Sequence, residues 1–253
     1  MIVFQERRGR HAAKRSLIML LGTALVVSLA IQAFGGAEIE KKTCNRQRAH
    51  AKSTHEGRDN KMRKVILALQ VTLDGFIEGP KGELDWAMKE DEETWKDVFE
   101  LQRPADTLLL GRVMYTAFEK YWLAAPTNPS STKNEIEYAR LADNMQKIVF
   151  SKSLEKVEWK TTGIIKDHIA EEILKMKQQP GKDMVLLGGA RLVSTFMNLG
   201  LIDEYHLIVN PVVVGGGKPL FKDIKKQHKL NLIKTKMFKS GKVVLHYGKG
   251  PES

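Results

Sequence analysis

Cysteine is almost absent from this chain of 253 residues, which contains a single one, Cys44. One cysteine excludes an intrachain disulfide and a cluster of thiolate metal ligands. The seven histidines are scattered, and none shows the H-x-x-x-H or H-E-x-x-H spacing of a metal site. We therefore expect no metal centre. The G-x-G-x-x-G dinucleotide fingerprint and internal repeats are also missing.

Acidic residues are the scarcer charged class, since 41 Lys and Arg against 30 Asp and Glu give a net charge of +11. The excess is uneven along the chain. Residues 1–61 contain 12 basic and 5 acidic residues, whereas residues 62–253 contain 29 and 25. The body is therefore only mildly basic, and we expect no nucleic-acid partner. A weakly basic surface suits an anionic small ligand.

The longest run without charge covers residues 16–37 and follows five basic residues, as in a signal peptide or membrane anchor. Five more basic residues follow it closely, so the charges predict no orientation. The alternative is an over-extended reading frame, because residues 38–61 read as disordered and the domain pattern begins at Met62. Both interpretations of residues 1–61 stay open. The first predicts a membrane-anchored or exported protein, and the second a cytoplasmic one.

Short apolar runs of strand length alternate with helical patterns from residue 62 to residue 250. Strands are predicted at Arg63–Thr72, Thr107–Leu110, Lys147–Phe150, Met184–Leu187, Leu230–Phe238 and Val243–Tyr247. Helices are predicted at Asp91–Leu101, after Gly111-Arg112, from the capping box Thr132-x-x-Glu135 through Met145, and at Asp167–Lys177. The inward-facing side chains expected on two of these helices are Met114, Ala117, Phe118, Ile169, Ile173 and Leu174. The alternation predicts an α/β fold with helices on both faces of the sheet and an antiparallel ending.

The most informative segment runs from Asp183 to Phe221. An apolar run ends at Gly188-Gly189, and a helical pattern begins at once, with Gly200 where a helix C-cap belongs. The inward face of this helix is predicted to carry Leu192, Val193, Phe196 and Met197. Glycine lets a backbone approach a ligand closely, and a helix N-terminus presents unpaired N–H groups to an anion. The segment therefore predicts a phosphate-bearing, nucleotide-type ligand.

Four blocks in order resemble the dihydrofolate reductase-like superfamily, and most closely the C-terminal reductase domain of the bifunctional riboflavin-pathway deaminase-reductase. They are ALQVTLDGFIEG (68–79), TLLLGRVMYTAF (107–118), KIVFSKSL (147–154) and LLGGARLV…GLIDEYHLIVNPVVVGGGKPLF (186–221). The resemblance covers residues 62–250 and implies a stand-alone reductase domain. The implied fold is a mixed, mostly parallel central sheet with helices on both faces and antiparallel C-terminal strands.

The resemblance implies an NADPH-dependent reductase whose cofactor lies across the carboxyl edge of the sheet. Its motifs carry over to the following positions. Gly188, Gly189, Ala190 and Arg191 match the glycine turn for the pyrophosphate, and Gly111 and Arg112 match the pair that opens the second helix. Ser151 and Lys152 match the loop near the adenosine 2′-phosphate. Ala68 and Ile77 match backbone positions that hold the carboxamide, and Asp74 matches the acid beside the substrate pocket.

Several of these residues have plain structural interpretations. Asp74-Gly75 reads equally as a turn or as a substrate-orienting acid or proton relay. Lys152 reads equally as a surface residue. Arg112 favours ligand contact, because a cation at a helix N-terminus is unfavourable unless an anion lies near. His206 alternates with apolar strand residues and reads as structural.

The resemblance leaves the substrate open. Dihydrofolate reductases use a carboxylate on the first helix, and counting back from Gly111 puts Trp95 there, which argues against a pterin clamp. The favoured reaction is the riboflavin type, reduction of a ribosylamino-pyrimidine phosphate to its ribityl form. Dihydrofolate reduction and a catalytically silent, nucleotide-binding dimer are the alternatives. Relatives usually form homodimers, so a second copy is the expected partner.

Overall fold

The computed structural model describes residues 62–88 and 91–251. The apolar run 16–37 and the rest of the extension 1–61 lie outside these residues. Within the described ranges, no helix is both long enough and apolar enough to cross a membrane.

The core of the protein is an eight-stranded sheet with the order β5-β4-β3-β6-β1-β7-β10-β9. All neighbours from β5 to β7 pair in parallel, whereas β10 pairs antiparallel with both β7 and β9. This confirms the predicted mixed, mostly parallel sheet with an antiparallel ending. The strands are β1 Val65–Thr72, β3 Ala105–Gly111, β4 Gln146–Phe150, β5 Thr162–Ile165, β6 Asp183–Gly188, β7 Glu204–Asn210, β9 Leu230–Met237 and β10 Val243–Lys249. A separate pair joins β2 Phe76–Glu78 to β8 Lys218–Pro219.

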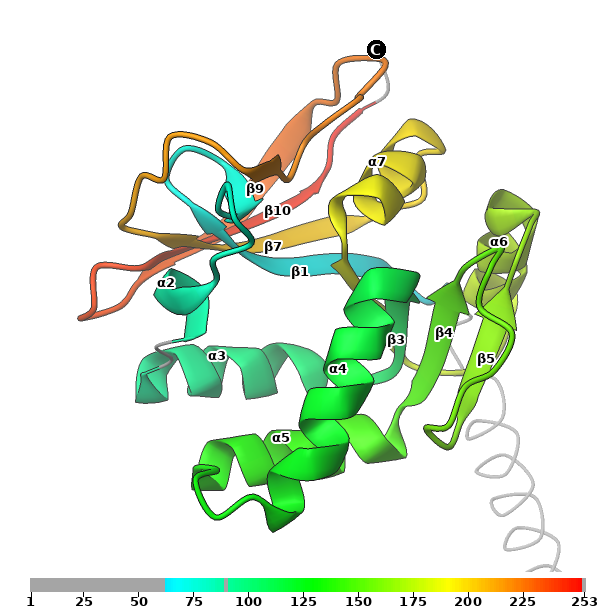
Figure 1. Cartoon of the computed structure of the whole chain (residues 1–253). Helices are drawn as coiled ribbons and strands as arrows, with labels where there is room; N and C mark the ends of the chain where they lie inside the picture. The colour runs from blue at the N-terminus through cyan, green and yellow to red at the C-terminus, as the bar shows by residue number, and fades with distance from the viewer. Residues whose placement is uncertain (1–61, 89–90, 252–253) are drawn as a thin grey trace, which may run out of the picture. The chain divides into compact units, whose positions relative to one another are not determined.

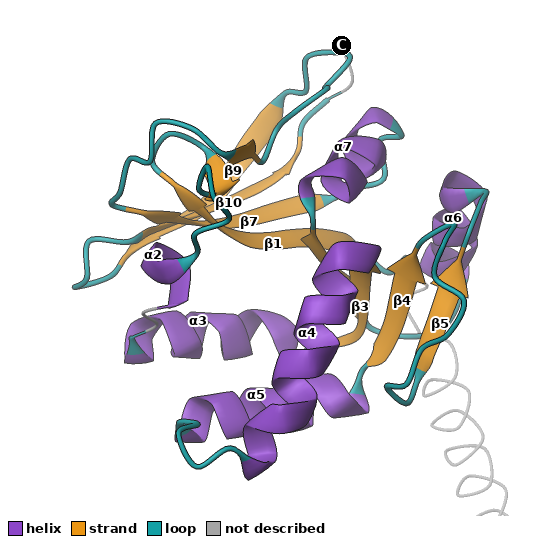
Figure 2. Cartoon of the chain, viewed as in Figure 1, coloured by secondary structure: helices purple, strands orange, loops and turns teal. Residues whose placement is uncertain are grey.

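Helices cover both faces of the sheet, as Figures 1 and 2 show. The helices are α2 Asp85–Met88, α3 Glu92–Gln102, α4 Arg112–Ala124, α5 Lys133–Asn144, α6 Ile169–Gln178 and α7 Ala190–Asn198, with a short 3-10 turn at Ala125–Thr127. One apolar cluster packs α6 and α7 against one face, and a second packs α3, α4 and α5 against the other. Alternate residues of each central strand enter opposite clusters, as Leu108 and Leu109 of β3 do.

Local sequence signals account for three of the helix ends. Asp91 caps α3 by accepting a hydrogen bond from the N–H of Thr94 at 2.7 Å. The predicted capping box of Thr132 and Glu135 opens α5. Gly200 has φ +67° just after α7, a conformation that glycine adopts without the steric penalty of a side chain. These three boundaries were predictable because caps act over a few residues.

Two of the inward-facing predictions were wrong, whereas the four on α7 are confirmed. Ala117 is exposed, because α4 turns Tyr115 into the core, with Met114 and Phe118 half-buried beside it. Leu174 is also exposed, since α6 covers the short edge strands and buries a narrower stripe. The short elements β2, β5, β8 and α2 were not predicted.

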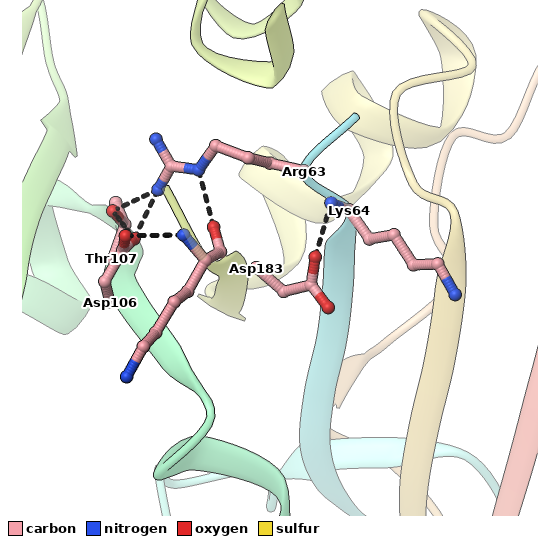
Figure 3. A network of polar contacts seen from close by, with 6 residues as sticks. Arg63, Lys64, Asp106, Thr107 and Asp183 are labelled. Carbon is pink, nitrogen blue, oxygen red and sulfur yellow. Dashed lines mark hydrogen bonds and ion pairs between the residues drawn. The ribbon is translucent and has the colours of Figure 1, made fainter. Parts of the chain in front are cut away.

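The amino edge of the sheet is held by a buried arginine, which Figure 3 shows. Arg63 is 7% exposed, and its Nε donates to the carbonyl of Lys182 at 2.5 Å. Its Nη2 donates to the Thr107 hydroxyl at 2.8 Å and to the carboxylate of Asp106. That carboxylate also accepts from the N–H of Lys182 at 2.7 Å. One guanidinium therefore joins the amino ends of β1, β3 and β6.

Two further aspartates bind the first strand by its backbone. The carboxylate of Asp183 accepts from the N–H of Lys64 at 2.8 Å (Figure 3), and that of Asp203 accepts from the N–H of Val65 at 2.7 Å. Lys177 of α6 pairs with Asp203 at 2.6 Å. The charged side chains named at the amino edge are therefore paired with one another or with the backbone of the neighbouring strands.

Replacing Arg63 by methionine should lower the free energy of unfolding by about 1–3 kcal/mol, because charge-assisted hydrogen bonds are lost and their acceptors stay partly buried. Urea denaturation measures this change. The matched control is Arg103→Met, whose pair with Glu137 is exposed and should contribute roughly 0–1 kcal/mol. Equal stability of the Arg63 variant and the wild type would contradict the amino-edge assignment.

Candidate functional site

The chain leaves two neighbouring strands toward opposite faces of the sheet. Strands β3 and β6 pair in parallel, and α4 follows β3 whereas α7 follows β6. Helix α4 packs in the cluster with α3 and α5, and α7 packs in the other cluster with α6. Helices that diverge in this way leave a crevice at the carboxyl ends of their strands, which is where open α/β sheets bind ligands.

Glycines form the walls of this crevice. A Cβ atom placed on Gly111 would lie 3.4 Å from the carbonyl oxygen of Gly188 and 3.5 Å from the nitrogen of Gly189. The two turns therefore touch through their backbones. Gly188 has φ +87°, its peptide bond to Gly189 is cis, and a Cβ on Gly189 would meet nothing within 4 Å. The crevice is thus bounded by bare backbone and open on the side of Gly189.

Both helices that begin here lack the usual anionic complement of a helix N-terminus. Gly111 is the N-cap of α4 and Gly189 the N-cap of α7, so neither has a side-chain cap, and neither first turn contains an acidic residue. Instead, Arg112 and Arg191 are exposed in these first turns. A cation near the positive end of a helix dipole destabilises the helix when no anion lies close by. An anion bound between the helices would offset both penalties.

The next strand end along the edge carries Ser151 and Lys152. Phe150 of β4 pairs with Gly111 of β3, so Ser151 follows at the neighbouring position. The Ser151 hydroxyl accepts from the N–H of Ser153 at 3.2 Å and that of Leu154 at 2.9 Å, and so shapes its own loop.

Lys152 is exposed and pairs with Asp167 at 2.9 Å, and this pairing lowers the pKa of the Asp167 carboxyl. Lys152 also lines a hollow of about 370 Å³ at the start of α6. Lys166, His168, Asp167 and Glu171 line the same hollow, so two lysines and a histidine face two carboxylates there. The lining therefore carries charges of both signs, and Lys152 already has a partner within the chain.

The two predicted carboxamide positions lie on different elements. Ala68 is buried in the middle of β1, on the face that α3 covers. Ile77 lies on β2 and packs against the other cluster. A Cβ on Gly188 would touch the side chain of Leu69 at 3.4 Å, so β1 passes directly beside the glycine turn.

Asp74 is tied to a distant loop through its carboxylate. It accepts from the Thr72 hydroxyl at 2.6 Å, from the N–H of Gly215 at 2.8 Å and from that of Val214 at 3.2 Å. The Thr72 hydrogen bond is the main cause that holds the pKa of Asp74 below its ordinary value, and the two backbone donors add to it. This geometry makes Asp74 a positioning residue for the glycine loop that follows β7.

The same loop is fixed at Gly217. Its φ is +124°, and a Cβ there would overlap the carbonyl oxygen of Glu78. Only glycine allows this approach, which brings β8 against β2. The turn after β1 and the turn after β7 therefore form one unit beside the crevice.

Sequence reasoning missed a buried ionic pair between α3 and β7. The Nε2 atom of His206 lies 2.6 Å from a carboxylate oxygen of Asp97, and both residues are more than 90% buried. Trp95, which gapless counting placed at the pterin-binding position, packs instead among Phe99, Trp122 and Tyr138. Asp97, two residues after Trp95, is therefore the carboxylate of α3 that faces the sheet.

The family model described as the RibD C-terminal domain matches residues 63–245. The uncharacterized protein YyaP of Bacillus subtilis (strain 168) is 41% identical over 187 residues, which cover 74% of this chain and 95% of that protein. The family model thus covers most of the described residues.

Two solved structures share its fold. A pyrimidine reductase-like protein from Corynebacterium diphtheriae has a TM-score of 0.53 and 12% identity, and the match covers 76% of this chain and 94% of that one. The diaminohydroxyphosphoribosylaminopyrimidine deaminase/5-amino-6-(5-phosphoribosylamino)uracil reductase of Thermotoga maritima has a TM-score of 0.53 and 15% identity. That match covers 75% of this chain and 57% of the longer protein. At these identities the likeness is one of fold.

Replacing Asp74 by asparagine should free the glycine loop, because an amide can offer only one acceptor oxygen to three donors. Hydrogen exchange at the amides of Val214 and Gly215 measures this and should accelerate at neutral pH. The wild-type effect is present above the ordinary carboxyl pKa and is lost as the pH falls through the lowered folded-state value.

The control for this experiment is Asp223→Asn, at an exposed position with φ +56°, which asparagine tolerates well. It should leave exchange at Val214 and Gly215 unchanged. Unaltered exchange in the Asp74 variant would show that other contacts hold the loop.

Proposed function

This chain belongs to the RibD C-terminal domain family, and from that premise we propose that it is an NADPH-dependent reductase of the riboflavin type. Its substrate would be a small heterocyclic or sugar-phosphate compound. The Thermotoga maritima relative is named as a 5-amino-6-(5-phosphoribosylamino)uracil reductase, which makes that compound the first substrate to test.

The observation that carries this proposal is the glycine crevice between β3 and β6. It fits a pyrophosphate on three grounds. The turns at Gly111 and Gly188-Gly189 are bare backbone, the N-termini of α4 and α7 lack side-chain caps, and each first turn has an exposed arginine and no acidic residue. A dinucleotide phosphate satisfies all three at once.

Each predicted residue then has a role in binding. Gly188, Gly189 and Ala190 would present backbone N–H groups to the pyrophosphate, and Arg112 and Arg191 would add charge from the two sides. Ala68 and Ile77 would hold the carboxamide through their backbones. When bound, the dihydronicotinamide supplies the hydride.

A preference for NADPH over NADH would come from the loop after β4. Lys152, Lys166 and His168 line one hollow there. A 2′-phosphate would compete with Asp167 for Lys152, so the lysine could change partner when the ligand arrives. Ser151 would act through its loop, because its hydroxyl already accepts two backbone hydrogen bonds.

Dihydrofolate reduction is the second candidate, and one observation favours it. Helix α3 does turn a buried carboxylate, Asp97, toward the sheet, although the aligned position holds Trp95. Buried carboxylates on this helix suit a pterin only where their protonation can be tuned. Dihydrofolate therefore belongs in the substrate screen beside the ribosylamino-pyrimidine.

Fluorescence titration of the purified protein should give tight NADPH binding and weaker NADH binding. Arg112→Ala should weaken both by about 1–3 kcal/mol, because one charge-assisted hydrogen bond is lost. Lys152→Ala should weaken NADPH alone. The exposed Lys156 of the same segment provides the control, and its alanine variant should bind like the wild type. Absence of binding of both cofactors would refute the reductase.

We extend the proposal to a homodimer, the partner expected from the family. Strand β9 is an edge of the described sheet, and Leu232, Ile233 and Met237 on it are 57%, 54% and 78% exposed. Exposed apolar side chains on an edge strand favour association with another sheet. The surface offered by these three residues is where a second copy would pack.

Sedimentation of the wild type should give a dimer, and Met237→Glu should shift it toward the monomer, because a charge would be buried at the contact. Leu174→Glu provides the control, since this residue is 51% exposed on α6, away from β9. A monomeric wild type, or a dimer indifferent to Met237→Glu, would contradict this assignment.

A further inference from the structure

Lysines are concentrated in one segment of the body. Residues 218–242 contain nine lysines, no arginine and a single acidic residue, Asp223. The remainder of residues 62–253 contains 20 basic and 24 acidic residues, so its net charge is negative. The mildly basic total therefore hides one strongly cationic segment on an otherwise acidic body. An asymmetry of this kind is typical of a surface that meets an anionic partner.

The loop between β8 and β9 contains four of these lysines, and we call residues 221–229 the lysine loop. Its four lysine side chains are exposed, and none of them pairs with a carboxylate of the described chain. Lys218 and Lys236, on the flanking strands, do have such partners in Glu78 and Asp97. The charges of the loop are therefore available to a partner outside the chain. The four lysines are Lys222, Lys225, Lys226 and Lys229.

Helix α7 holds the first half of the lysine loop in place. The Ser194 hydroxyl donates to the carbonyl of Lys222 at 2.5 Å. The Asn198 amide donates to the carbonyl of Asp223 at 3.0 Å and accepts from the N–H of Lys225 at 2.9 Å. These bonds use only the backbone of the loop. The helix therefore fixes the path of the chain and leaves the lysine side chains to the solvent.

The far end of the lysine loop lies at the amino edge of the sheet. The N–H of Gly250 donates to the carbonyl of Lys229 at 2.9 Å, and the N–H of Lys249 donates to the carbonyl of Asp203 at 2.8 Å. The carboxylate of Asp203 in turn binds the N–H of Val65, the first residue of β1. The N-terminal extension therefore joins the body at the edge where the lysine loop ends.

The sequence of that extension contains the uncharged run 16–37 with five basic residues on each side. One of its two interpretations is a membrane anchor. An anchor attached at the amino edge would bring the end of the lysine loop toward a bilayer. The place where the extension joins the body thus favours a lipid surface as the anionic partner.

An exposed aromatic side chain begins the lysine loop. Phe221 is 45% exposed and directly precedes Lys222. Segments that bind at a membrane surface combine these two features, because an apolar ring enters the headgroup region while lysines attract anionic headgroups. The loop therefore has both components of an interfacial contact.

The composition of the segment argues against nucleic acid as the partner. Arginine is the preferred residue for phosphate and base recognition, and residues 218–242 contain none. Binding of a single strand also needs a basic groove that follows the backbone. The lysine loop lines neither the hollow at α6 nor the hollow between α3 and α5. Compact lysine charges on a loop without a groove suit a broad anionic surface.

We propose that the lysine loop is a docking surface for an anionic membrane, that is, a bilayer with negatively charged phospholipid headgroups. The acidic remainder of the body would be repelled by the same headgroups. The protein therefore docks in one orientation, with α7 and the lysine loop toward the lipid. This inference is independent of the proposed reductase function, and it uses none of the three residues assigned to the dimer contact.

The first test is co-sedimentation of the full-length protein with vesicles. It should bind vesicles made of equal parts phosphatidylcholine and phosphatidylglycerol, and bind phosphatidylcholine vesicles far less. Replacing the four lysines by glutamine should weaken binding by about 5-fold for each lysine, and so by more than about 100-fold together. Raising the salt from about 0.1 M to about 1 M should also release the protein, because the screening length falls from about 10 Å to about 3 Å.

The control variant changes the net charge equally on other surfaces. It replaces four exposed lysines of the loops and helices outside the segment by glutamine and should keep most of the affinity for the mixed vesicles. These residues are Lys120, Lys133, Lys156 and Lys175. Equal losses in the two variants would mean that net charge alone attracts the protein, and would overturn the proposal. Binding of the lysine-loop variant like the wild type would overturn it as well, because other residues would then make the contact.

The second test needs no variant. Hydrogen exchange at the amides of residues 221–229 in the full-length protein should slow when the mixed vesicles are added and stay unchanged with phosphatidylcholine alone. The amides of α4 provide the internal control and should not respond. Co-sedimentation without protection of the lysine loop would contradict the assignment. Protection by a single-stranded oligonucleotide, with none from the mixed vesicles, would replace the membrane by nucleic acid.

Discussion

The backbone contact between the turns after β3 and β6 is the constraint on which the rest of the site depends. Gly111 lies so near Gly188 and Gly189 that a Cβ on it would be in van der Waals contact with their backbone. The contact is possible because α4 and α7 leave these strands toward opposite faces of the sheet. Both helices begin at this edge without a side-chain cap, and each carries an arginine and no acidic residue in its first turn. The proposed anion site rests on these two helix N-termini.

The charged residues at the amino edge of the sheet stabilise the fold, whereas those at the carboxyl edge include the candidates for ligand binding. At the amino edge, Arg63 is surrounded by acceptors from three strands, and each aspartate there bonds to the backbone of β1 or its neighbours. At the carboxyl edge, polar groups are either exposed, as Arg112 is, or bound to loops that the fold needs, as Asp74 is. The exposed arginines in the first turns of α4 and α7 are the physical reason to look for a ligand at the carboxyl edge.

The predictions that the structure confirms rest on patterns that span only a few residues. The strand, the two glycines and the α7 face from Leu192 to Met197 follow from periodicity, and the capping box follows from two residues three apart. Ala117 and Leu174 were misplaced because periodicity gives a face but not the width of its buried stripe. The bonds from Asp74 to Gly215 and from His206 to Asp97 join residues more than 100 positions apart, so no local pattern could predict them.

The role of each polar group near this edge depends on the hydrogen bonds that it already makes. Both oxygens of Asp74 accept hydrogen bonds from the hydroxyl and backbone N–H groups that shape its loop, so a proton placed there would break the contacts that position it. His206 differs because one nitrogen is satisfied by Asp97 and the other by nothing in the described chain. The described hydrogen bonds therefore give both groups structural partners, since Asp74 holds the glycine loop and the pair of His206 and Asp97 joins β7 to α3. The proposed ligand contacts depend instead on the arginines exposed at the N-termini of α4 and α7.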